Sequence, residues 1–166
     1  METTITYQDQ RKRKLIAFNI VIALLLLLWV PVSIDKMVDF ASFKDGILNQ
    51  PFSDSLGHIL IYTLPAFELL TVFALVSKKF RRVGLILSTL LMAGFTGYVA
   101  VALLGAWEKL PCGCGSVIKE MNRTQHFFFN LLFLVLSILG FYLWYKLRGS
   151  TVGYEAIEGG SAKRQT

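Results

Sequence analysis

Four apolar stretches, each close to the length of about 20 residues that a helix needs to cross a bilayer, dominate this chain. They cover residues 15–32, 59–76, 83–106 and 127–145. Hydrophobic residues make up 54% of the chain and charged residues only 17%, which is typical of a membrane protein. Backbone polar groups inside a bilayer must be satisfied within each segment, so helices are expected. The sequence therefore predicts an all-α fold, a four-helix transmembrane bundle in one domain over residues 15–147.

The first apolar stretch is expected to stay in the protein rather than to be cleaved as a signal peptide. Its apolar core is longer than the core of a signal peptide, and no small-x-small cleavage site follows it. The residues that do follow, Pro31-Val32-Ser33-Ile34, are a poor substitute for such a site. We therefore count this stretch as a retained helix.

The basic residues predict how the bundle is oriented in the membrane. Twelve of the 17 Lys and Arg residues lie before the first apolar stretch, between the second and the third, or after the fourth. They are Arg11, Lys12, Arg13, Lys14, Lys78, Lys79, Arg81, Arg82, Lys146, Arg148, Lys163 and Arg164. The other five, among them Lys36 and Arg123, fall on the opposite side. The positive-inside rule then places both termini and the 78–82 turn in the cytoplasm.

This orientation places the two segments that flank the bundle in the cytoplasm. Residues 1–14 form a basic N-terminus, and residues 148–166 form a cytoplasmic tail. The tail is rich in Gly, Ser and charge, and from Gly149 it is expected to be disordered. Because the basic residues mark topology, the net charge of +6 does not indicate nucleic acid as a partner. The expected partner is the lipid bilayer.

The two cysteines of the chain lie in Pro111-Cys112-Gly113-Cys114-Gly115, between the third and the fourth apolar stretch. The predicted orientation puts this loop outside, on the oxidising side, where disulfides form and persist. A disulfide across one residue is far from the preferred geometry, so it is easily reduced, as catalytic disulfides are. We expect thiol–disulfide exchange at this pair; the alternative is two small residues in a flexible loop. A C-x-C pair with one distant histidine supplies too few ligands for zinc, so no metal is expected.

Three polar side chains in or beside the apolar stretches are candidates for cofactor binding or proton transfer. Glu68 is the only acidic residue within an apolar stretch, and ionisable residues inside a bilayer are costly and usually functional. It could handle protons, contact a quinone, or hydrogen-bond to a neighbouring helix. His126 and Asn130 lie four residues apart, on one helix face near the cysteine loop. There they could meet the carbonyl oxygens of a quinone, although His126 could also be an ordinary interfacial residue.

Local signals predict three details of the helices. The outer loop over residues 33–58 has the apolar spacing of a short interfacial helix, which Pro51 would break; the alternative is a solvated connector. Asn122 or Thr124 is expected to cap the fourth helix. Glycines of the third apolar stretch are expected to let helices approach closely, since small residues do so in membranes. These glycines are Gly94, Gly97 and Gly105.

Taken together, these features resemble the MauE/DoxX family of redox-associated membrane proteins over residues 15–147. Besides the four spans, the resemblance rests on Ser33-Ile34-Asp35-Lys36, on Leu64-Pro65-Ala66-Phe67-Glu68-Leu69-Leu70, and on the cysteine segment. The cysteine segment is similar to the P-C-x-C-x-G motif of the MauE branch, except that Gly115 directly follows the second cysteine. The DoxX branch generally lacks the cysteine pair, so the MauE branch fits better.

The resemblance implies a role in disulfide formation in exported proteins, as proposed for the maturation of methylamine dehydrogenase, though not methylamine metabolism itself. It implies a multi-pass protein of the bacterial cytoplasmic membrane, with the cysteine loop on the periplasmic side. The bundle is also similar to the membrane core of vitamin K epoxide reductase-like enzymes, which use a second cysteine pair as a shuttle. This chain has none, so a thioredoxin-like exported partner would have to carry electrons.

The function expected from the sequence is therefore that of a membrane thiol–disulfide redox protein. Cys112 and Cys114 would exchange disulfides, and a membrane quinone near His126, Asn130 and Glu68 would accept the electrons. The alternative is a DoxX-like, non-catalytic assembly subunit of a larger membrane complex.

Overall fold

The computed structural model describes residues 2–51, 53–105 and 122–162, and over these ranges all regular secondary structure is helical. The helices are α1 (Glu2–Val38), α2 (Phe40–Leu48), α3 (Asp54–Val76), α4 (Arg81–Leu103) and α5 (Arg123–Ala162). In this part of the chain α1, α3, α4 and α5 are each long and apolar enough to cross a membrane. The prediction of an all-α fold with four membrane spans is confirmed.

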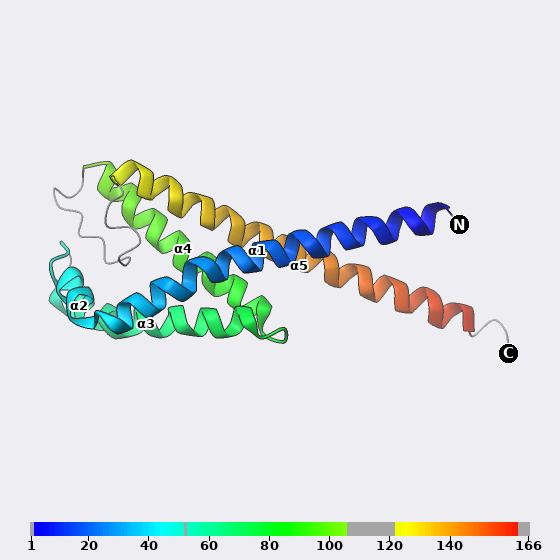
Figure 1. Ribbon diagram of the computed structural model, residues 1–166, viewed down its shortest axis with the longest axis horizontal. Helices are drawn as coiled ribbons and strands as arrows, with labels where there is room; N and C mark the ends of the chain where they lie inside the picture. Colours follow the sequence, from blue (N-terminus) through cyan, green and yellow to red (C-terminus); the bar gives the residue numbers. More distant parts are fainter. Residues whose placement is uncertain (1, 52, 106–121, 163–166) are drawn as a thin grey trace.

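The four spanning helices pack in a ring. Both α1 and α4 pack against α3 and α5, so α3 and α5 lie at opposite corners. Figure 1 shows α2 and the start of α5 at one end of the bundle. At the other end lie the turn between α3 and α4, the start of α1 and the last turns of α5 (Figure 1). The beginning and the end of the chain therefore share one end of the bundle with the basic turn, as the predicted topology requires; its direction across a membrane stays a prediction.

α1 and α5 are much longer than the apolar stretches that they contain. α1 begins at Glu2, well before the 15–32 stretch, and α5 runs to Ala162, well past the 127–145 stretch. The sequence predicts a disordered tail from Gly149, and the structure describes the tail as helical as far as Ala162. Nucleation is the costly step in helix formation, and each further residue adds one hydrogen bond to a helix that already exists. A polar segment can thus continue the helix of the span before it.

One face of α1 supplies much of the apolar core. Its buried residues recur at intervals of four, three, four and three: Phe18, Ile22, Leu25, Trp29 and Val32. This spacing keeps them on a single stripe along the helix. The stripe packs against Leu75 of α3 and against Leu85 and Met92 of α4, which are also buried. The exposed opposite face of α1, which includes Leu24 and Leu27, is apolar as well and suits contact with lipid.

Two glycines mark close approaches between helices. A Cβ atom at Gly84 of α4 would lie 2.8 Å from the backbone nitrogen of Leu75 in α3. A Cβ atom at Gly140 of α5 would lie 2.8 Å from Cδ2 of Leu85 in α4. Real Cβ contacts are not this short, so a larger residue at Gly84 would push the backbones of α3 and α4 apart, whereas one at Gly140 would require the Leu85 side chain to move.

The glycines expected to serve this purpose do not. Within the part of the chain that the structure describes, no atom lies within 4 Å of a Cβ atom built at Gly94, Gly97 or Gly105, so the expectation that they let the described helices approach closely is wrong. Gly94 and Gly97 are exposed on α4. Gly105 follows the C-cap residue Leu104 with a φ of +81°, the left-handed conformation with which glycine commonly ends a helix.

The loop between α1 and α3 contains the short helix that the sequence predicts. Asp39 caps the start of α2, because its Oδ1 accepts a hydrogen bond from the backbone nitrogen of Ser42 at 3.2 Å. Phe43 and Ile47, one turn apart, are buried in a small apolar cluster with residues of α3. The helix ends before Pro51, as expected. The short helix is confirmed, and the alternative of a solvated connector is wrong because one face of the helix packs on α3; its position at the membrane interface stays a prediction.

Candidate functional site

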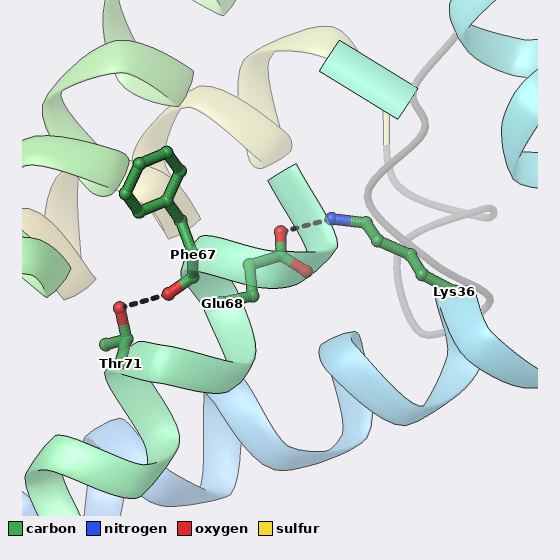
Figure 2. A network of polar contacts seen from close by, with 4 residues as sticks. All are labelled: Lys36, Phe67, Glu68 and Thr71. Atoms are coloured by element: carbon green, nitrogen blue, oxygen red, sulfur yellow. Dashed lines mark hydrogen bonds and ion pairs between the residues drawn. The ribbon is translucent and has the colours of Figure 1, made fainter. Parts of the chain in front are cut away.

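Lys36 of α1 and Glu68 of α3 form an ion pair inside the bundle (Figure 2). The two side chains are 2% and 0% exposed, and Lys36 Nζ donates a hydrogen bond to Glu68 Oε1. A single charge is very costly to bury, so each of these groups makes the burial of the other possible. The expectation that Glu68 contacts a neighbouring helix is confirmed. Its roles in proton transfer or quinone binding stay predictions.

The ammonium group of Lys36 also lies against two aromatic rings. Its Nζ atom is 5.3 Å from the ring centroid of Phe43 in α2 and 5.6 Å from that of Phe95 in α4. The faces of aromatic rings attract cations, and more strongly where water is excluded. One side chain at the end of α1 therefore interacts with three other helices.

Sequence reasoning missed Lys36, because it ended the first helix at Val32 and left Lys36 on the outer side with the loop. The structure continues α1 to Val38 and puts Lys36 in its last turn. The signal that could have found it is its spacing. Lys36 follows Val32 by four residues, so it extends the buried stripe of α1 by one position.

One buried oxygen atom of this ion pair, and one of a residue near Lys36 in the sequence, have unused hydrogen-bonding capacity. Glu68 Oε2 and Ser33 Oγ have no hydrogen-bond partner within the described part of the chain. Ser33 lies three residues before Lys36, so the two side chains share a face of α1. A buried polar group without a partner costs about 1–3 kcal/mol. Such groups are expected where a bound molecule or a transferred proton completes the hydrogen bonding.

The start of α5 is fixed by a reciprocal cap. Asn122 Oδ1 accepts a hydrogen bond from the backbone nitrogen of Gln125 at 2.8 Å, and Gln125 Oε1 accepts one from the backbone nitrogen of Asn122 at 3.1 Å. This arrangement satisfies two donors at the helix start, as a capping box does. The prediction that Asn122 caps this helix is confirmed. The cap sets the register that places His126 in the first turns of α5.

His126 and Asn130 are both buried on α5, at 4% and 3% exposure. Their shared face, expected from the four-residue spacing, therefore points into the protein. Asn130 Nδ2 is a buried donor without a partner among the residues that the structure describes. This buried face of α5 therefore has at least one hydrogen-bond donor without a partner among the described residues, at the end of the bundle where α1 ends.

The candidate site residues come from opposite corners of the ring. Glu68 lies on α3, and its described contact runs to Lys36 of α1, whereas His126 and Asn130 lie on α5. α1 packs against both α3 and α5, and its last turn lies at the same end of the bundle as the first turn of α5 (Figure 1). The structure thus places Lys36, rather than Glu68, on the helix next to α5. Cys112 and Cys114 lie outside the described residues.

A second polar network, which sequence reasoning also missed, lies deeper in the core. Trp29 Nε1 of α1 donates to Ser88 Oγ of α4 at 2.9 Å, and Ser88 Oγ lies 2.8 Å from Ser137 Oγ of α5. Ser137 Oγ also donates to the carbonyl oxygen of Phe133 at 2.9 Å. The network joins three helices, and each of these three side chains has a hydrogen-bond partner within it.

Comparison with known proteins finds one family. The family model described as "Methylamine utilisation protein MauE" matches residues 13–143, which is most of the chain. The matched range contains the cysteine pair, the ion pair of Lys36 with Glu68, and the buried face of α5. No curated protein matches the chain, and no solved structure matches it either.

Proposed function

The chain belongs to the MauE family, and on that premise we propose that it is an integral membrane thiol–disulfide redox protein. The proposal is that Cys112 and Cys114 exchange disulfides with exported proteins and so support their maturation. Family membership, the C-x-C spacing and the four membrane spans support it. So does the charge distribution, which predicts that the cysteine loop faces the oxidising side.

The proposed reaction balances as two exchanges. In the first, the two thiols of a thioredoxin-like exported partner become a disulfide, and the Cys112–Cys114 disulfide becomes two thiols. In the second, these two thiols lose two electrons and two protons, and their disulfide forms again. A membrane quinone, when bound, supplies the acceptor for both electrons and both protons. The partner must bring its own cysteine pair, because this chain has no second one.

The observation that best supports a quinone at this end of the bundle is the open amide of Asn130. Its Nδ2 is buried and has no partner in the described residues, so a hydrogen bond to a ligand would satisfy it. A quinone oxygen is an uncharged acceptor, which an amide N–H can bind without burying a charge. His126 lies one turn earlier on the same buried face and adds a ring that can donate through N–H. We propose that Asn130 and His126 hold the quinone oxygens.

We propose that Glu68 accepts and releases protons and does not itself contact the quinone oxygens that Asn130 and His126 hold. It lies on the helix opposite α5, and its Oε1 is already bonded to Lys36. Its Oε2 has no partner in the part of the chain that is described, so it can accept a proton. Lys36 and Ser33 are buried polar residues of α1, the helix that packs against both α3 and α5.

The test is reoxidation of the reduced protein in liposomes that contain or lack a quinone, with free thiols trapped by alkylation over time. We expect Asn130→Leu and His126→Ala to slow quinone-dependent reoxidation at least about tenfold, which corresponds to a loss of about 1.4 kcal/mol of stabilisation. Ser137→Ala is the matched control, because it removes a buried polar group of α5 that the core network already satisfies. Equal slowing in all three variants would mean that Asn130 and His126 serve only packing.

The cysteines themselves separate this proposal from the alternative of a non-catalytic assembly subunit. If the function in cells survives Cys112→Ser combined with Cys114→Ser, the redox proposal is wrong and the assembly role is favoured. Loss of function with normal levels of folded protein in the membrane supports the redox role.

A further inference from the structure

The basic end of the bundle contains a cavity far from the candidate redox site. It lies between the first turns of α1 and the C-terminal part of α5 and has a volume of about 840 Å³. Arg11, Lys12, Leu15 and Phe18 line it from α1, and Trp144 and Arg148 line it from α5. We call it the basic cavity.

The basic cavity carries a net positive charge. Arg11, Lys12 and Arg148 contribute three cations to its wall. One anion, Asp9, also lines it, but its Oδ2 lies 2.9 Å from Arg13 Nη2, so Arg13 balances this charge. The remaining charges favour an anionic ligand.

Aromatic contacts hold one of these cations in place. The guanidinium carbon of Arg148 lies 5.4 Å from the ring centroid of Trp144, and that of Arg82 lies 5.6 Å from the same ring. Trp144 therefore keeps two guanidinium groups beside the wall of the cavity, and neither has an acidic partner among the ion pairs of the described residues. A guanidinium fork of this kind suits a phosphate group.

The depth of the cavity matches the boundary of a membrane. Its floor is level with the turn between α3 and α4, because the Arg81 guanidinium carbon lies 5.8 Å from the ring centroid of Phe18. Lys12 lies six residues before Phe18, or about 9 Å of helix rise. The polar layer of one leaflet is about 5–8 Å thick, from the difference between the full bilayer and its hydrocarbon core. The apolar floor of the cavity therefore lies at the depth of the acyl chains, and its charged wall lies at the depth of the headgroups.

We propose that the basic cavity binds an anionic phospholipid of the cytoplasmic leaflet. Its phosphate group contacts Arg11, Lys12 and Arg148, and its acyl chains lie against Leu15 and Phe18. Each basic residue at a membrane surface contributes about 1 kcal/mol to attraction of anionic lipid. Because the lipid contacts both α1 and α5, it stabilises the parts of these two helices that extend beyond α3 and α4 at this end.

The experiment compares two variants with the same change in net charge. One replaces the cations of the cavity, in Arg11→Gln, Lys12→Gln and Arg148→Gln. The other replaces basic residues at the same end that do not line it, in Lys14→Gln, Lys79→Gln and Lys146→Gln. The purified full chain is titrated with phosphatidylglycerol in neutral detergent micelles. Bound lipid is measured by native mass spectrometry and the shift in Tm by thermal melting.

We expect phosphatidylglycerol to bind and raise the Tm, and phosphatidylcholine and inorganic phosphate to do neither. The cavity variant should bind phosphatidylglycerol at least about tenfold more weakly, since three charges at about 1 kcal/mol each set a ceiling near a hundredfold. The control variant should bind almost as tightly as the unaltered protein. Equal weakening in both variants would show diffuse surface attraction and overturn the site. Equal binding of inorganic phosphate or of phosphatidylcholine would overturn the choice of an anionic lipid.

Discussion

Lys36 and Glu68 form their ion pair where four helices meet: Lys36 ends α1, Glu68 comes from α3, and rings of α2 and α4 lie on either side of the ammonium group. The pair therefore joins four helices at the α2 end of the bundle. Whatever role Glu68 has in proton transfer, the contact also matters for stability.

Removal of one partner should cost more than removal of both. Glu68→Leu leaves the charge of Lys36 buried without a partner, and Lys36→Met does the same to the charge of Glu68; in proteins such a change costs about 3–5 kcal/mol. Lys36→Met combined with Glu68→Leu leaves no buried charge, so its loss should be much smaller than the sum of the two single losses. Thermal melting in detergent measures all variants. Additive losses would contradict the ion pair.

Gly84→Ala should destabilise the contact between α3 and α4. The added methyl group would lie 2.8 Å from the backbone nitrogen of Leu75, and a backbone cannot move aside cheaply. Overpacking of this kind costs about 1–3 kcal/mol. Gly94→Ala in the same helix is the matched control, because no atom of the described residues lies within 4 Å of its added atom, and it should be neutral or slightly stabilising. The melting temperatures of the two variants are compared with that of the unaltered protein. An unchanged melting temperature for Gly84→Ala would disprove the close approach of α3 and α4.

Ser88→Ala should destabilise the bundle more than Ser137→Ala. Without Ser88 Oγ the indole N–H of Trp29, a residue 1% exposed, has no acceptor, and an unsatisfied buried donor costs about 1–3 kcal/mol. Without Ser137 the indole keeps its acceptor, and the hydroxyl of Ser88 can rotate to donate to the backbone carbonyl one turn earlier in α4, so only a net contribution of about 0.5–1.5 kcal/mol is lost. Chemical or thermal unfolding, followed by Trp fluorescence, ranks the two. The reverse order would show that Trp29 is satisfied elsewhere.

The sequence predicted the features that depend on local patterns. Apolar length identified the four spans, the apolar spacing in the 33–58 loop indicated the short helix α2, and Asn122 was one of two residues expected to cap α5. In each case the physical cause lies within a few residues of the chain. The buried face shared by His126 and Asn130 was likewise readable from their spacing.

Features that depend on contacts between distant segments were not predicted. The role of Lys36 depends on Glu68, which is 32 residues away, and it became visible only when α1 proved to extend past Val32. In the same way, Gly84 is important because Leu75 passes close to it, whereas Gly94 faces outward. A glycine in a sequence does not show which neighbour it will meet. The length of α1 and α5 was missed because helix propagation into polar sequence depends on the span that nucleates it.

The predicted orientation can be tested with the cysteines of the chain. In spheroplasts treated with a reductant, a membrane-impermeant maleimide should label Cys112, since the charge distribution puts its loop outside. A Lys79→Cys variant in a background without other cysteines is the control, and it should react only after the membrane is ruptured. Labelling in the opposite pattern would reverse the topology and remove the oxidising environment that the redox role needs.

The redox state of Cys112 and Cys114 in intact membranes tests the central proposal most directly. Cells are quenched with acid, free thiols are alkylated with a maleimide that shifts the mass, and the two oxidation states are separated. The pair should be largely a disulfide at steady state, become a dithiol after a pulse of reductant, and return to a disulfide only while quinone is available. A pair that stays reduced throughout, or a disulfide that the reductant cannot open, would contradict a role in thiol–disulfide exchange.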